Sequence, residues 1–196
     1  MKSIKSVDDM GRYQAVTLVS FFVFMGFVPG NQLHARCPDR AAVIRDSASA
    51  GIAEGVTADS LVIDKGDRTM CLYSGGAVVK RYAIALGFEP VGPKRRQGDG
   101  RTPEGRYTIS GRNPESIYHL SLRISYPDAE DRHRARKVGL NPGGDIFIHG
   151  WPDSVAEKNA SPPTGDWTRG CIAVTDAEIE ELWRAVSVGT PVVILP

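Results

Sequence analysis

The stretch SLVIDKGDRTMCLYSGGAVVKRYAIALG, residues 60–87, consists of short apolar segments separated by glycine turns. Three of its segments have the length and side chains of β-strands: Leu61–Asp64, Met70–Tyr73 and Val78–Leu86. The turns between them, KGD and SGG, are short enough to join neighbouring strands of an antiparallel sheet. This part of the chain therefore predicts a β-meander.

A second group of strands is expected further along the chain. In IYHLSLRISY, residues 117–126, apolar residues alternate with His119, Ser121, Arg123 and Ser125, which is the period of a β-strand. The polar face of this strand either meets solvent or lines a polar cleft. Further short strands are expected at residues 107–110, 145–149, 171–174 and 192–195.

Two helices complete the expected elements. The segment PDAEDRHRARKVG, residues 127–139, predicts a charged helix that ends at glycine. Thr175 and Glu178 form a capping box for a second helix. The apolar face of that helix consists of Ile179, Leu182, Trp183 and Val186. About eight short strands and two helices predict a mainly β domain, a sandwich or barrel with one or two attached helices, rather than a doubly wound sheet.

The N-terminal residues have a different character. Lys2, Lys5 and Arg12 precede an apolar run, Ala15–Val28, and the small residue Ala35 offers a cleavage point. This pattern is typical of a secretory signal, and an uncleaved membrane anchor is the alternative. Either one predicts an exported protein of the periplasm or cell envelope.

The domain boundaries follow from this pattern. Residues 1–35 are interpreted as the signal peptide or anchor, and residues 36–59, which are small and polar, as an N-terminal extension or linker. Residues 60–196 then form a single folded domain, which is long enough for a hydrophobic core. Contact with a membrane is expected only through the N-terminal segment.

The charge balance excludes one class of partner. The chain has 24 basic and 23 acidic residues, and cleavage after Ala35 leaves 21 of each. A neutral chain is not suited to binding nucleic acid through its phosphates. The local basic run Lys94–Arg96 lies in a long loop rich in glycine and proline, residues 87–105, and is expected to form a solvated face of that loop.

Three cysteines are present, Cys37, Cys71 and Cys171. In an oxidising compartment two of them can pair, and a Cys37–Cys71 disulfide would leave Cys171 as a single thiol. The alternative is that all three are free. Arg36 directly precedes Cys37 and argues against lipid attachment there, because a small residue is expected at that position.

Cys171 and His149 are the candidate catalytic pair. Each lies at the end of an expected strand beside a glycine, which lets another group approach the backbone closely. An imidazole can take the thiol proton, and the resulting thiolate attacks a carbonyl carbon. The backbone N–H groups of Gly170 and Cys171 would stabilise the oxyanion. Three other interpretations stay open: a buried core cysteine, a histidine that is merely hydrogen-bonded, and a metal site completed by His119 or His133. No cofactor is expected.

Three ordered motifs resemble the catalytic domain of the L,D-transpeptidases, also called YkuD-type domains. TPEGRY at residues 102–107 resembles the family's Thr-Pro-x-Gly-aromatic turn. IHG at residues 148–150 resembles its histidine segment, and TRGCIAV at residues 168–174 resembles its Gly-Cys signature. The likeness extends over residues 61–196 and implies a mostly β fold of the L,D-transpeptidase type.

The resemblance also implies roles for individual residues. Cys171 would be the nucleophile and His149 the general base, and Gly170 and Cys171 would supply the oxyanion N–H groups. Many members carry arginine or asparagine two residues after the cysteine, where this chain has Ala173. Substrate contacts are expected at Gly150, Thr168, Arg169 and His119.

The reaction implied by the resemblance takes place on peptidoglycan stem peptides. The cysteine attacks the carbonyl of an L-centre, forms a thioester and releases a D-amino acid. An amine of a second stem peptide, or of an envelope protein, then resolves the acyl-enzyme. The alternatives are a hydrolase with the same Cys-His site, such as an L,D-carboxypeptidase or amidase, and a non-catalytic peptidoglycan-binding module.

Overall fold

A computed structural model describes residue 37, residues 51–154, residue 161 and residues 163–196. These residues lie within one of the two units of the chain, His34–Pro196. The expected signal or anchor lies outside the described residues, as does most of the expected linker. Within the described ranges, no helix is long and apolar enough to cross a membrane.

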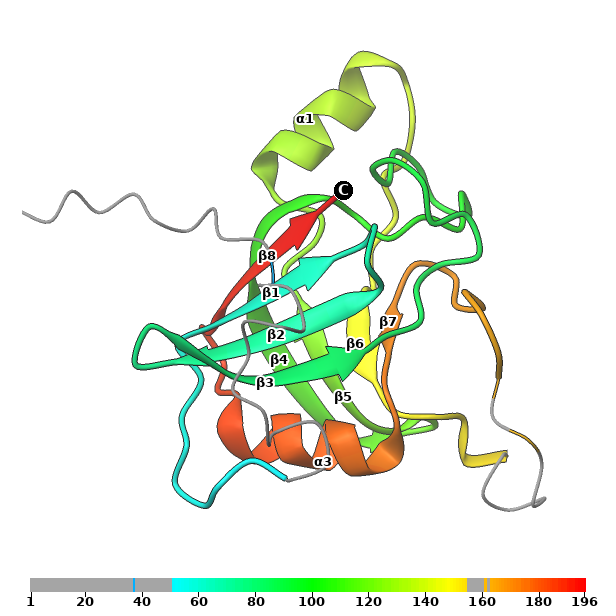
Figure 1. Cartoon of the computed structure of the whole chain (residues 1–196). Helices are drawn as coiled ribbons and strands as arrows, with labels where there is room; N and C mark the ends of the chain where they lie inside the picture. Colours follow the sequence, from blue (N-terminus) through cyan, green and yellow to red (C-terminus); the bar gives the residue numbers. More distant parts are fainter. Residues whose placement is uncertain (1–36, 38–50, 155–160, 162) are drawn as a thin grey trace, which may run out of the picture. The chain divides into compact units, whose positions relative to one another are not determined.

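Eight strands of the described region form one curled sheet in the order β3-β2-β1-β8-β4-β5-β6-β7 (Figure 1). Antiparallel pairing of β1 with β2 and of β2 with β3 confirms the predicted meander. β8 lies between the two halves of the sheet, parallel to β1 and antiparallel to β4. The strands are β1 (Ser60–Asp64), β2 (Thr69–Ser74), β3 (Ala77–Ala83), β4 (Gly105–Ser116), β5 (His119–Ile124), β6 (Phe147–His149), β7 (Ile172–Ala173) and β8 (Pro191–Leu195).

Two strand boundaries differ from the sequence prediction. β3 ends at Ala83 instead of Leu86, because Ala85 leaves the meander and exchanges hydrogen bonds with Ala173 of β7 at 2.9 and 2.8 Å. β4 continues to Ser116, because it forms a long antiparallel hairpin with β5. The predicted strand at residues 107–110 covers only part of β4.

The two described helices, α1 (Ala129–Lys137) and α3 (Asp176–Ala185), confirm the predicted ones. In Figure 1, α1 lies above the strands of the sheet and α3 lies below them. The capping box predicted for α3 is present, with Thr175 accepting from the Glu178 N–H and the Glu178 carboxylate accepting from the Thr175 N–H. The apolar face of α3 joins the hydrophobic core, in which Ile179 and Leu182 are fully buried. This face fixes α3 beneath β5 and β6, the strands that approach the candidate site.

A buried ammonium group fastens the long loop between β3 and β4. Lys65 has a side chain that is 2% exposed. Its Nζ donates to the carbonyl oxygens of Gly92 and Thr102 at 2.7 and 3.0 Å, and to the Glu104 carboxylate at 2.7 Å. These bonds span 27 to 39 residues of sequence. The loop is therefore tied to the sheet through specific polar contacts despite its irregular backbone.

Cys37 and Cys71 form a disulfide, with their Cα atoms 5.7 Å apart. Cys71 is fully buried in β2. Cys171 is the free cysteine. The structure thus contains the pairing that the sequence left open, and it leaves one thiol near the end of the chain.

We expect the oxidised, denatured protein to contain one free thiol per chain, and three after reduction, because one disulfide consumes two cysteines. Ellman titration in guanidinium chloride, with and without prior reduction, measures both numbers. Cys171→Ala is the control and should lower the first count to zero. Three free thiols before reduction would contradict the Cys37–Cys71 bridge.

Candidate active site

The short strands β6 and β7 bring the segments that carry His149 and Cys171 side by side. They pair in parallel, with Ile148 beside Ile172 and His149 beside Ala173. Cys171 directly precedes β7, two residues before Ala173, whereas Ile148 and Ile172 point into the core. Side chains two residues apart on an extended chain point to the same side, so an extended backbone at Cys171 would place its thiol on the face of Ala173 and His149.

A backbone contact fixes the tautomer of His149. Its Nδ1 lies 2.7 Å from the carbonyl oxygen of Gly150, and a carbonyl only accepts, so Nδ1 carries the proton. Nε2 keeps its lone pair, as a general base requires. Gly150 is itself held by Tyr118 and Leu120, whose carbonyls accept from its N–H at 3.1 and 3.3 Å.

Aromatic rings enclose the imidazole of His149. The ring centroid of Tyr118 lies 4.4 Å away and that of Trp167 lies 5.7 Å away. His149 is only 3% exposed. This burial lowers its pKa below the ordinary value of 6.5, although the bond to Gly150 acts in the opposite direction. His149 is therefore neutral at neutral pH and able to accept a proton.

Cys171 rests as a thiol. It is half-buried, and its S–H donates to the carbonyl oxygen of Asp145 at 3.6 Å. Burial raises the pKa of the thiol, while the N–H of Phe147 and the positive charge of Lys94 oppose that rise. A base is therefore needed to form the thiolate, and His149 of the neighbouring strand β6 has a lone pair on Nε2.

Thr168 braces the turn that leads into Cys171. Its side chain is buried, and its Oγ1 accepts from the Gly170 N–H at 3.1 Å and donates to the Cys171 carbonyl at 2.7 Å. The structure thus gives Thr168 an internal role, and the substrate contact expected there stays a prediction. Because the Gly170 N–H is engaged by Thr168, the N–H of Cys171 is the remaining one of the two expected oxyanion donors.

The other expected substrate contacts differ in their surroundings. Gly150 acts through its backbone, and a Cβ there would lie 2.5 Å from Asp176 Oδ1, so only glycine is accommodated. Arg169 is exposed, two residues before Cys171. His119 is partly exposed, and its Nε2 lies 2.8 Å from a carboxylate oxygen of Glu180 in α3.

The metal-site interpretation gains no support from the described residues. His133 is exposed on α1, and His119 contacts α3. Over residues 51–154 and 163–196, no group of three or more His, Cys, Asp or Glu side chains is placed to hold a metal ion.

The polar face of β5 lines the site. Ser121 lies directly opposite His149 in the antiparallel β5–β6 pair, and residues directly opposite each other share a face. Ser121 is buried. Arg123, opposite Phe147, forms an ion pair with Asp145 at 2.9 Å. Two surroundings were predicted for this face. Ser121 has the polar, buried surroundings of a cleft, and Arg123 is in contact with solvent.

A cavity of about 310 Å³ adjoins the catalytic pair. It borders the site through Trp167 and Ala173, whereas Cys171 and His149 do not line it. An ion pair at 2.9 Å between Arg68 and Asp166 forms part of its wall. The lining residues are Arg68, Ala83, Ile84, Ala85, Trp151, Pro163, Gly165, Asp166, Trp167, Ala173, Val174 and Thr175.

Sequence reasoning missed three residues of this site: Tyr118, Trp167 and Lys94. Trp167 directly precedes the TRGC segment, and Tyr118 begins the alternating strand, so aromatic residues beside the motifs were an available signal. No local pattern indicated that the charge of Lys94 acts on Cys171, because the two residues lie 77 positions apart.

A model of the YkuD family, the L,D-transpeptidase catalytic domain, matches residues 58–194. The match includes β1 to β7, β8 as far as residue 194, His149 and Cys171. The chain belongs to the L,D-transpeptidase catalytic-domain family. This membership confirms the resemblance inferred from the three motifs.

The chain is also similar to individual proteins. It is 30% identical over 131 residues to the "Putative L,D-transpeptidase YafK" of Escherichia coli K12, an alignment that covers 64% of this chain and 46% of that protein. The solved structure of Bdellovibrio bacteriovorus Bd1075 matches with a TM-score of 0.50 and 26% identity, over 74% of this chain and 50% of that one.

A further solved structure supports the fold. The helical cell shape determining protein Pgp2 from Campylobacter jejuni matches with a TM-score of 0.55 and 23% identity, over 76% of this chain and 51% of that one. The chain thus spans about half the length of these relatives. The mainly β fold predicted from the sequence is confirmed, as a curled sheet with two described helices.

We expect the His149 imidazole of the L,D-transpeptidase domain to titrate below pH 6.5, because its burial disfavours the charged form. NMR of protein labelled in its histidine rings measures the midpoint, and His149→Gln identifies the signal. The unfolded chain binds this proton more readily, so the group destabilises the fold as the pH falls below about 6.5. A midpoint at or above 6.5 would contradict the enclosed, neutral base.

We expect Gly170→Ala to destabilise the domain by roughly 3 kcal/mol. Gly170 has a φ of +125°, and a Cβ there would lie 2.6 Å from the carbonyl oxygen of Arg101. Gly98→Ala is the matched control: its φ is +76°, but nothing lies within 4 Å of its Cβ, and a loss of about 1 kcal/mol is expected. Chemical denaturation compares the two variants. Equal losses would show that Arg101 does not crowd this position.

Proposed function

We propose that the protein is a cysteine-dependent L,D-transpeptidase that acts on peptidoglycan stem peptides through a thioester acyl-enzyme. One observation carries the proposal: a neutral His149 with its lone pair on Nε2 lies in β6, beside the strand β7 that Cys171 directly precedes. Membership of the L,D-transpeptidase catalytic-domain family supports the reaction class. Thiol, base and family point to the same chemistry.

In the first step, Nε2 of His149 takes the thiol proton while Sγ of Cys171 bonds to the carbonyl carbon of the donor peptide. The N–H of Cys171 stabilises the negative charge on the carbonyl oxygen. The C–N bond then breaks, and His149 returns its proton to the departing amine of the D-residue. The donor peptide stays attached to Cys171 as a thioester.

In the second step, an amine of another stem peptide attacks the thioester carbonyl and gives a proton to His149. The C–S bond breaks, and Cys171 recovers its thiol proton from His149. Water in place of the amine would make the same site a hydrolase. The nucleophile that reaches the thioester therefore decides between the two activities.

The cavity beside His149 and Cys171 supports the proposal that the substrate is a peptide. Its volume of about 310 Å³ lies at the lower end of the range for ligand pockets. Trp151 and Trp167 provide apolar surface, and the Arg68 guanidinium provides a positive charge. We propose that part of the stem peptide occupies this cavity while its reacting carbonyl lies against Cys171.

The setting of the reaction is also part of the proposal. An exported protein has access to peptidoglycan, and the basic and apolar pattern of residues 1–35 supports export. The similar fold of Pgp2, which is named for cell shape, supports a role in building or remodelling the cell wall.

We expect Cys171→Ala to abolish the covalent acyl-enzyme formed with peptidoglycan fragments, because no sulfur remains to hold the acyl group. His149→Gln should slow turnover by about 10²- to 10⁴-fold. His133→Gln, which removes an exposed histidine of α1, is the matched control and should leave the rate unchanged. Mass spectrometry of the full chain and of the released products measures all three variants.

The products separate the candidate functions. Cross-linked stem peptides support the transpeptidase, and trimmed stems without cross-links favour the hydrolase instead. Binding without turnover, while Cys171 remains reduced, would leave only a peptidoglycan-binding module. An adduct that persists in Cys171→Ala would overturn the assignment of the nucleophile.

A further inference from the structure

Lys94 is a buried cation in the long loop next to the nucleophile. Its side chain is 3% exposed, and its Nζ lies 2.8 Å from Asp99 Oδ1. The same ammonium donates to the carbonyl oxygen of Arg96 at 3.2 Å. The expected solvated face of the basic run thus holds for Arg95 and Arg96, which are exposed, but is wrong for Lys94.

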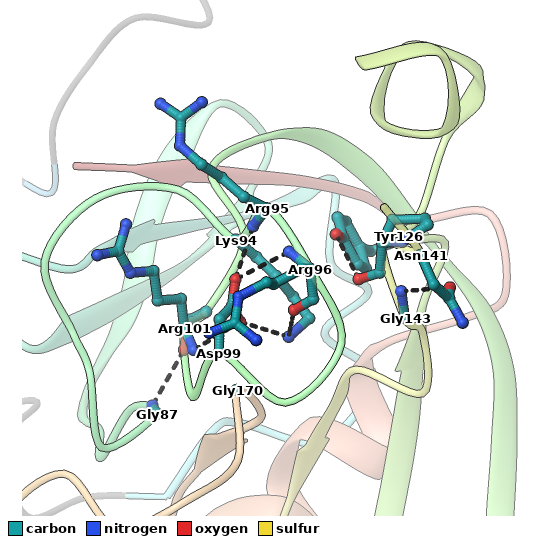
Figure 2. Close-up of polar contacts among 12 residues, drawn as sticks. Gly87, Lys94, Arg95, Arg96, Asp99, Arg101, Tyr126, Asn141, Gly143 and Gly170 are labelled. Carbon is teal, nitrogen blue, oxygen red and sulfur yellow. Dashed lines mark hydrogen bonds and ion pairs between the residues drawn. The ribbon is translucent and has the colours of Figure 1, made fainter. Parts of the chain in front are cut away.

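Asp99 is the organising group of this loop. Besides Lys94, its carboxylate accepts from the backbone N–H groups of Arg95, Arg96 and Arg101 at 2.7, 3.0 and 3.2 Å (Figure 2). Burial alone would raise the pKa of Asp99, but these four donors lower it to about 2. The carboxylate is therefore ionised across the physiological pH range, and it holds the Lys94 ammonium in place.

The loop is pressed against the turn that carries Cys171. A Cβ on Gly170 would lie 2.6 Å from the carbonyl oxygen of Arg101. A Cβ on Gly87 would lie 2.0 Å from the carbonyl oxygen of Gly100 and 3.0 Å from the Cα of Gly170. Three segments therefore meet backbone to backbone at this point, and a shift of the Asp99 loop would be transmitted to Cys171.

A buried ion pair is an inefficient way to stabilise a fold. Removing two charges from water costs about as much as their attraction returns, and well-packed apolar residues often serve equally well. The loop already has a polar anchor at Lys65. The loop that holds Lys94 packs through Arg101 against Gly170, the residue before Cys171, and this packing gives the buried charge a second use.

We propose that Lys94, held by Asp99, is a positioning residue whose buried positive charge favours the thiolate of Cys171. This inference rests on the proposed function in one respect, that Cys171 is the nucleophile. It assigns Lys94 no proton transfer and no contact with the peptide. Lys94 acts on the reaction only through the sulfur.

Other groups around the thiol also shift the pKa of Cys171. Burial raises the pKa of Cys171, and the Phe147 N–H and the Lys94 charge oppose this rise, while the negative charge of Asp145 adds to it. Asp145 is paired with Arg123 at 2.9 Å, which offsets part of its field. Among the charged groups of the described residues that act on this sulfur, Lys94 is the one that favours the thiolate.

The test uses the rate at which iodoacetamide alkylates Cys171 as a function of pH, measured on the full chain without reductant. With Cys37 and Cys71 in a disulfide, Cys171 is the reacting thiol. Lys94→Met should move the midpoint of the profile up by about half to one pH unit, and slow alkylation at pH 7 by about 3- to 10-fold. Lys94→Arg should restore the wild-type profile.

Two further variants keep the test decisive. Lys94→Gln removes the charge but retains a donor toward Asp99, so it reports on the charge even if Lys94→Met does not fold. It should shift the profile in the same direction. Arg95→Met removes an exposed charge from the same loop and is the matched control, expected to leave the profile unchanged. Thermal unfolding of each variant measures the structural effect separately.

The outcomes distinguish this inference from the proposed function. If the neutral variants lose thermal stability but keep the wild-type alkylation profile, Lys94 is only a structural anchor and the inference is overturned. Alkylation requires no peptidoglycan, so a shifted profile supports the inference whatever the products of turnover are. Absence of turnover in the wild type would count against the transpeptidase alone.

Discussion

The hydrogen bonds on both sides of β7 are the constraint on which the site depends. This strand has two residues, yet Ala173 exchanges bonds with Ala85 at 2.8 and 2.9 Å, and the Val174 N–H donates to the His149 carbonyl at 3.0 Å. Neither contact is local in sequence. The sheet must therefore curl until the segment after β3 meets β7, and this arrangement brings the segment that begins with Cys171 beside β6 and His149.

Burial then shifts the pKa values of the two candidate catalytic groups in opposite directions. It lowers the pKa of His149 and raises the pKa of Cys171. Both groups are consequently neutral at rest, with the proton on sulfur and the lone pair on Nε2. The proposed reaction begins by moving that proton, and every nearby charge that favours the thiolate makes the transfer easier.

How much of this structure the sequence predicts depends on how far apart in the chain the interacting residues lie. The meander and the capping box of Thr175 and Glu178 follow from turns and spacings within a few residues, and the structure confirms both. His149 and Cys171 were found because short motifs mark them. The burial of Lys94 arises from contacts between segments far apart in the chain. Its basic neighbours in sequence, Arg95 and Arg96, led to the prediction of a solvated face instead.

Ala173 lies at the position, two residues after Cys171, where the family resemblance implies arginine or asparagine. Its side chain lies beside His149 in the β6–β7 pair, so a longer side chain there would point along the catalytic face. Alanine instead leaves space, and the position lines the adjoining cavity. Among the described lining residues, Arg68 is the one guanidinium, and it is tied to Asp166 at 2.9 Å. The positive charge in the wall of this cavity therefore comes from Arg68, held by Asp166 of the segment that carries Trp167, and not from β7.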